Sequence, residues 1–137
     1  MISARNQIKG TVKEIKEGAV NGIVKVDAGN GITISSTISM ESIHSLGLAP
    51  GKEVTAIIKA TSVMIANGKL NISARNQLTG TVASIEKGAV NAIVKLDVPG
   101  GIGITSTISL EAVQDLGLAP GREATAIIKA TSVMIGA

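Results

Sequence analysis

The chain of 137 residues contains no cysteine, no phenylalanine, tyrosine or tryptophan, and one histidine, His44. Without cysteine, neither a disulfide framework nor a thiolate metal site can form. A single histidine also excludes a histidine-based metal cluster within one chain. Proteins that bind single-stranded nucleic acid use aromatic side chains as stacking platforms, at about 1–3 kcal/mol per base. The composition therefore argues against a nucleic-acid partner, and no bare metal cation is expected.

Charge is also sparse, because 13 basic and 10 acidic residues leave a net charge of +3. No long basic run exists, so this mild excess fits an anionic partner without requiring nucleic acid. No apolar run approaches the roughly 20 residues that cross a bilayer. Residues 1–9 lack the apolar region of a secretory signal. We therefore expect a cytoplasmic protein with no membrane partner.

A repeat dominates what the chain does contain. Each of its segments recurs 70 residues later without a gap, and the longest, Thr55–Ile65, recurs unchanged as Thr125–Ile135. The unit is too long for a solenoid repeat, so it indicates two domains, 1–67 and 68–137. A domain of under about 70 residues is marginal alone. We expect the halves to be stabilised by packing together or by oligomerisation.

Alternating apolar residues with many β-branched side chains predict strands over 7–16, 19–27, 32–38, 53–59 and 62–65. A short helix is expected over 39–46, with Ser39 as N-cap, Glu41 in the first turn and Gly47 at its end. Five strands with a helix between the third and fourth match the order of an OB-type barrel. The predicted fold is all-β with short helices, as two tandem OB-type five-stranded barrels. Asn67-Gly68 predicts a tight hairpin joining the halves.

Catalytic chemistry finds little support. His44 is the only candidate base for a nucleophilic triad, and its counterpart in the second half is Gln114, so it is interpreted as a solvent-facing helix residue. Glu14 and Glu17 become Ser84 and Lys87, so a duplicated carboxylate pair is not maintained. No phosphate-binding glycine motif is present. We therefore predict no enzymatic activity and no cofactor.

Oxyanion-binding groups are what both halves keep. Arg5 and Arg75 offer a planar fork of donors, and Lys59 and Lys129 a compact positive charge. Hydroxyls and the amides at the start of the predicted helix could add neutral donors; the hydroxyls belong to Ser3, Ser39, Thr61 and Ser62 and to their counterparts Ser73, Ser109, Thr131 and Ser132. The alternative is that the arginines snorkel and the lysines are solvated edge charges. Surface charges elsewhere did drift, as at Lys13 and Ala83, which makes the unchanged cations informative.

Ser-Ala-Arg-Asn-Gln, followed some 50 residues later by Thr-Ala-Ile-Ile-Lys-Ala-Thr-Ser-Val-Met, resembles the molbindin, or Mop, domain, and it does so twice over nearly the whole chain. The tandem arrangement is similar to the di-Mop molbindins, which bind molybdate and tungstate in the cytoplasm. The resemblance implies OB-type barrels assembled as a homotrimer, with oxyanion sites between subunits.

The same resemblance implies which residues bind the oxyanion. Carried over to this sequence, the ligand segments are Ser3, Ala4, Arg5, Asn6, Lys59, Ala60, Ser62 and, in the second half, Ser73, Ala74, Arg75, Asn76, Lys129, Ala130, Ser132. A hydroxyl from a neighbouring domain would be Ser39 or Ser109, or Ser42, which is Ala112 in the second half. The Gly-Ala-Val-Asn segments are candidates for a further axial site at Val20, Asn21, Val90 and Asn91.

The leading hypothesis is thus an intracellular molybdate or tungstate protein for storage and homeostasis. One alternative is an oxyanion-sensing module that acts on a molybdate transporter or regulator. The other is an OB-fold nucleic-acid-binding module, against which the missing aromatics argue.

Overall fold

A computed structural model describes residues 2–137 and divides the chain into two compact units. Unit 1 consists of the residues up to Ile58 together with Lys129–Ala137, and unit 2 is Lys59–Ile128. Each unit holds one five-stranded antiparallel sheet. The fold is therefore mostly strand with two short α-helices, and each curled sheet is of the OB type, as the sequence predicted.

In unit 1 the sheet order is β10-β4-β1-β2-β3. Its elements are β1 (Asn6–Lys16), β2 (Asn21–Asp27), β3 (Thr33–Ser39), α1 (Met40–Ser45), β4 (Glu53–Ile58), the 3-10 turn η2 (Ala130–Ser132) and β10 (Met134–Gly136). The first five agree closely with the segments expected from the alternation of apolar residues.

In unit 2 the sheet order is β5-β9-β6-β7-β8. Its elements are the 3-10 turn η1 (Ala60–Ser62), β5 (Met64–Ala66), β6 (Asn76–Lys87), β7 (Asn91–Val98), β8 (Ile102–Ser109), α2 (Leu110–Asp115) and β9 (Glu123–Ile128).

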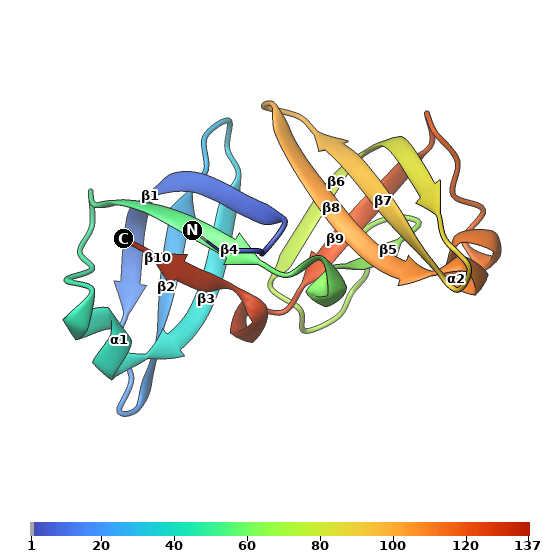
Figure 1. The fold of residues 1–137 in the computed structure, drawn as a ribbon. Coiled ribbons are helices and arrows are strands. Elements are labelled where there is room, and N and C mark those ends of the chain that lie inside the picture. The colour runs from blue at the N-terminus through green and yellow to red at the C-terminus, as the bar shows by residue number, and fades with distance from the viewer. Residues whose placement is uncertain (1) are drawn as a thin grey trace. The chain divides into compact units, whose positions relative to one another are not determined.

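The last strand of each repeat lies in the unit built by the other repeat. β10 pairs with β4, with Ile135 opposite Ala56, and β5 pairs with β9, with Ile65 opposite Ala126. In Figure 1 the red β10 lies beside the green β4, and the green β5 beside β9. The compact units therefore differ from the sequence repeats 1–67 and 68–137 in their last segments.

This exchange makes one sequence prediction wrong. Asn67-Gly68 does not form a hairpin between the halves, because β5 pairs with β9 and not with β6. Residues 67–75 instead lead from β5 to β6, and the Asn67 side-chain amide donates to the Leu116 carbonyl at 2.8 Å. A turn sequence can select a hairpin only where its flanking strands pair with each other.

Aliphatic side chains make up most of both cores. Burial alternates along strands such as β2 and β7. The fully buried side chains include Val24, Val26, Ile34 and Ile58 in unit 1 and Val94, Leu96, Ile104 and Ile128 in unit 2. A register shift between Val12 and Glu14, repeated between Val82 and Ser84, bends the long first strand of each unit. None of the helices within residues 2–137 is long and apolar enough to cross a membrane.

Candidate functional site

The Ser-Ala-Arg-Asn segment of the first repeat leads into β1. Ser3 and Arg5 are exposed, whereas Asn6 is only 2% exposed and pairs with Ile58 at the end of β4. The side-chain amide of Gln7 donates to the Ala4 carbonyl at 3.1 Å, which fixes the segment on the start of the strand. Ile58 is the residue before Lys59, where the second motif of this repeat begins and the chain passes into unit 2.

The Ser-Ala-Arg-Asn segment of the second repeat leads into β6 of unit 2. Arg75 is exposed, and the buried Asn76 pairs with Ile128, the residue before Lys129. Here Gln77 makes two hydrogen bonds to the backbone of Leu70, accepting from its N–H at 2.9 Å and donating to its carbonyl at 2.8 Å.

Each Lys-Ala-Thr-Ser segment forms a 3-10 turn. In η2 the Ser132 amide donates to the Lys129 carbonyl at 2.9 Å and the Val133 amide to the Ala130 carbonyl at 3.3 Å; η1 repeats both bonds with the same lengths. Ala60 and Ala130 are buried, Ser62 and Ser132 half-buried, and Lys59, Lys129, Thr61 and Thr131 exposed. Within residues 2–137, neither turn has a side-chain hydrogen bond capping its N-terminal amides.

The arginines and lysines that are identical in both repeats have no carboxylate partner in the described part of the chain. The ion pair found there is between Lys25 and Glu14, at 3.7 Å. Arg5, Arg75, Lys59 and Lys129 are thus exposed positive charges that anions can reach. Each of these cations suits an anionic ligand, because charge-assisted hydrogen bonds are stronger than neutral ones.

Ser39 and Ser109 lie elsewhere in their units. Ser39, at the end of β3, pairs with Asn21 at the start of β2. The start of β2 lies beside the last residues of β1, and Asn6 is at the other end of β1. Its hydroxyl caps α1 by accepting from the Ser42 amide at 3.0 Å, and it donates to the Ser42 hydroxyl at 2.8 Å. Ser109 accepts from the Ala112 amide at 3.0 Å, with no hydroxyl at position 112 to receive its proton. The structure thus does not bring these serines to the Arg–Lys ends within a unit.

The Gly-Ala-Val-Asn segments form the hairpin tips between the first two strands of each unit. Val20 and Val90 are 74% and 72% exposed, which is high for large apolar side chains, and Asn21 and Asn91 are exposed as well. The Val20 and Val90 carbonyls accept from the amides of Met40 and Leu110, the first residues of the helices. The tips are therefore fixed, apolar and open to solvent.

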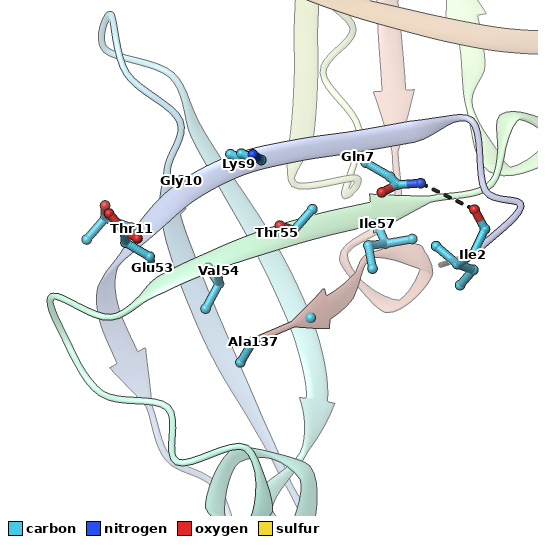
Figure 2. A pocket seen from close by; sticks show the side chains of 11 residues that line it. Ile2, Gln7, Lys9, Gly10, Thr11, Glu53, Val54, Thr55, Ile57 and Ala137 are labelled. Atoms are coloured by element: carbon cyan, nitrogen blue, oxygen red, sulfur yellow. Dashed lines mark hydrogen bonds between the residues drawn. The ribbon is translucent and has the colours of Figure 1, made fainter.

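The grooves of the two units do not coincide with these residues. The larger groove, of about 880 Å³, lies along β1 and β4, and its lining includes both Lys9 and Glu53 (Figure 2). At one end of it the Gln7 side-chain amide donates to the Ile2 carbonyl at 3.4 Å. The smaller, of about 650 Å³, contains the carboxylates of Asp97 and Glu123. Carboxylates disfavour a dianion, so neither groove is a candidate oxyanion site.

The described residues also contain no cluster of potential metal ligands. Among residues 2–137, no three histidine or acidic side chains are grouped so as to hold a metal ion. His44 is exposed in the last turn of α1, as expected from the sequence.

Sequence reasoning missed one pair of residues, Ser36 and Ser106. Both are 0% exposed, and their hydroxyls donate to the carbonyls of Val133 and Val63, at 2.6 and 2.5 Å. The available signal was a serine among the inward-facing isoleucines of the third strand, repeated at the same place in both halves. A buried hydroxyl requires a partner, and here the partner lies next to a predicted ligand turn.

The chain matches one family model twice, that of the TOBE domain, over residues 2–65 and 72–135. Among curated proteins it is 42% identical over 135 residues to the molybdenum-pterin-binding protein MopA of Rhodobacter capsulatus, covering 97% of this chain and 51% of MopA. It is 41% identical over 136 residues to the molybdenum transport protein ModE of Azotobacter vinelandii, covering 97% of this chain and 50% of ModE. The chain therefore spans about half the length of these relatives.

Shorter and full-length matches complete the comparison. A probable molybdenum-pterin-binding protein of Haemophilus influenzae is 63% identical over 67 residues, which are 49% of this chain and 97% of that protein. The crystal structure of the cytoplasmic molybdate-binding protein ModG with molybdate bound superposes with a TM-score of 0.96 at 51% identity, covering 98% of this chain and 97% of ModG.

Proposed function

The chain belongs to the TOBE-domain family, as a tandem of two such domains, and on that premise we propose that it binds molybdate and tungstate for intracellular storage and homeostasis. The observation that carries the proposal is the match over almost the whole chain to a structure that holds molybdate. It is supported by Arg5 and Arg75, which are exposed before the first strand of each unit and have no carboxylate partner among residues 2–137.

The proposed ligands are the Ser-Ala-Arg-Asn and Lys-Ala-Thr-Ser segments predicted from the sequence. Arginine contributes a planar fork of donors and lysine a point charge. At an effective dielectric constant near 20, each close contact with a dianion contributes a few kcal/mol. The uncapped amides of the 3-10 turns and the serine hydroxyls would add neutral donors that select for a tetrahedral shape.

We further propose a homotrimer in which copies of the chain complete each site. Ser39 lies away from the end of its own unit where Arg5 is found, so a hydroxyl of this kind would have to reach Arg5 from outside unit 1, and we propose that a second copy supplies it. The exposed valines of the hairpin tips are suited to burial in such an assembly. Light scattering coupled to gel filtration tests the assembly, with three chain masses expected and one chain mass contradicting it.

A binding role without catalysis, in the cytoplasm, fits the relatives, whose names describe binding and transport of molybdenum. Thermal unfolding with added oxyanions tests the binding. A ligand present at about 100 times its Kd stabilises the folded state by about 2.7 kcal/mol. Molybdate and tungstate are therefore expected to raise the Tm by several degrees, and sulfate and phosphate to raise it less. A Tm that molybdate leaves unchanged would refute the proposal.

A second candidate is an oxyanion-sensing module acting on a transporter or regulator. The match to ModE favours it, because ModE has about as much chain again beyond the matched part. Affinity capture with and without molybdate separates the two roles: a partner retained only with molybdate supports sensing, and storage predicts none.

A further inference from the structure

Each predicted Lys-Ala-Thr-Ser turn is anchored to a third strand by one buried hydroxyl. Ser36 on β3 donates to the Val133 carbonyl, and Ser106 on β8 makes the equivalent bond to Val63. Val133 and Val63 are the C-cap residues of η2 and η1 and are 1% exposed.

Ala130 and Val133 of the turn are buried, but apolar packing is not directional. The turn's two internal hydrogen bonds shape the backbone from Lys129 to Val133 but do not connect it to the sheet. The strand ladder of β10 begins only at Met134, after the turn. η2 packs against β3, so the Ser36 bond is where the turn receives a directional, polar link to its unit.

We propose that Ser36 and Ser106 are positioning residues for oxyanion binding, which hold the ligand turns 129–132 and 59–62 in their binding geometry. The inference rests on the proposed function, because it concerns the same ligand segments. It adds that each turn is positioned by the other repeat: Ser36 of the first repeat holds the turn of the second, and Ser106 holds that of the first.

The physical reason is that a buried carbonyl must have a donor. Without the hydroxyl, the buried Val133 carbonyl would lose the donor that Ser36 supplies, and the turn would shift to regain one. Groups that orient a ligand from outside the contact shell typically alter affinity by about 10- to 100-fold when they are removed. Since each serine serves one turn, a single variant should impair only the sites that use that turn.

The test is a molybdate titration by calorimetry of the full chain and of Ser36→Ala, Ser106→Ala and the double variant. Each single variant is expected to become biphasic, with about half of the bound molybdate weakened by about tenfold or more. In the double variant all of the binding should be weakened. Ser36→Thr, which keeps the hydroxyl, should bind more tightly than Ser36→Ala.

Ile34→Val is the matched control for stability, because Ile34 is 0% exposed on the same strand and its loss of a methylene leaves the Ser36 bond in place. Ile34→Val should lower the Tm, and its molybdate titration should stay monophasic. Unchanged molybdate affinity in Ser36→Ala, or an equal loss of affinity in Ile34→Val, would overturn the positioning role alone. If the unsubstituted chain binds no molybdate, the proposed function fails and the inference with it.

Discussion

Arg5 and Arg75 are exposed side chains at the start of each first strand, and neither is part of a core. Arg5→Ala combined with Arg75→Ala should therefore leave the Tm of the free protein nearly unchanged. Loss of charge-assisted hydrogen bonds, each worth about 1.5–3 kcal/mol, should weaken molybdate binding at least tenfold. Calorimetric titration of the variant provides the measurement.

The control for net charge is Lys13→Ala with Arg122→Ala, which also removes two exposed positive charges. Ala83 already occupies the position equivalent to Lys13. If this control lost as much affinity as the arginine variant, the arginines would act through overall charge and not as ligands.

The backbone around Gly80 leaves no room for a side chain. A Cβ there would overlap the backbone carbonyl of Asp97 on the neighbouring strand. Gly80→Ala is expected to destabilise unit 2 by about 1–3 kcal/mol, as overpacking does. Gly103, which pairs with Asp97 from the other side, has open space at its Cβ position. Chemical denaturation should show Gly103→Ala within about 0.5 kcal/mol of the parent; equal losses would show that Gly80 is not sterically constrained.

At the scale of elements, the two short helices differ in how their N-cap serines are used. The Ser39 hydroxyl donates a hydrogen bond to the Ser42 hydroxyl, whereas the residue equivalent to Ser42 in α2 is Ala112, which cannot accept one from Ser109. Ser39→Ala and Ser109→Ala should each cost about 1 kcal/mol of stability through the lost cap. If these hydroxyls also bind the oxyanion, Ser109→Ala should reduce molybdate affinity more than Ser39→Ala. Paired melting and titration curves separate the effects, and a larger affinity loss in Ser39→Ala would contradict this ranking.

The sequence predicted the elements well because local patterns decide them. Alternating apolar residues, many of them β-branched, predicted β1 to β4. Ser39 as N-cap, Glu41 in the first turn and Gly47 after the last turn predicted α1. The 3-10 turns were missed, and 62–65 was expected as strand, because three residues are too few to show a period. The site was predicted as two motifs of one repeat, and this stays a prediction; the ladder pairs Asn6 with Ile58, the residue before Lys59. The buried bonds of Ser36 and Ser106 depend on tertiary contacts that no local pattern contains.

For the whole molecule, the exchange of β5 and β10 has a consequence for stability. Ile135 belongs to the second repeat but packs on β4 of unit 1, and Ile65 belongs to the first repeat but packs on β9 of unit 2. Ile135→Val, at about 0.5–1.5 kcal/mol, should lower hydrogen-exchange protection mainly in residues 6–58. Ile65→Val should lower it mainly in residues 76–128. The reverse pattern would place each strand with its own repeat.

No reading of the sequence could have predicted that exchange. Thr55–Ile65 and Thr125–Ile135 are identical, so either last strand offers the same side chains and register to either sheet. The chain passes between the units at Ile58–Lys59 and at Ile128–Lys129, before each last strand, and the Asn67-Gly68 signal pointed to the wrong partner strand.

The central claim is that this tandem chain binds molybdate, and calorimetric titration of the full protein tests it most directly. Molybdate and tungstate should each give saturable heat at micromolar protein, while sulfate and phosphate at the same concentrations should give little. Absence of heat with molybdate, or equal heat with sulfate, would contradict the account.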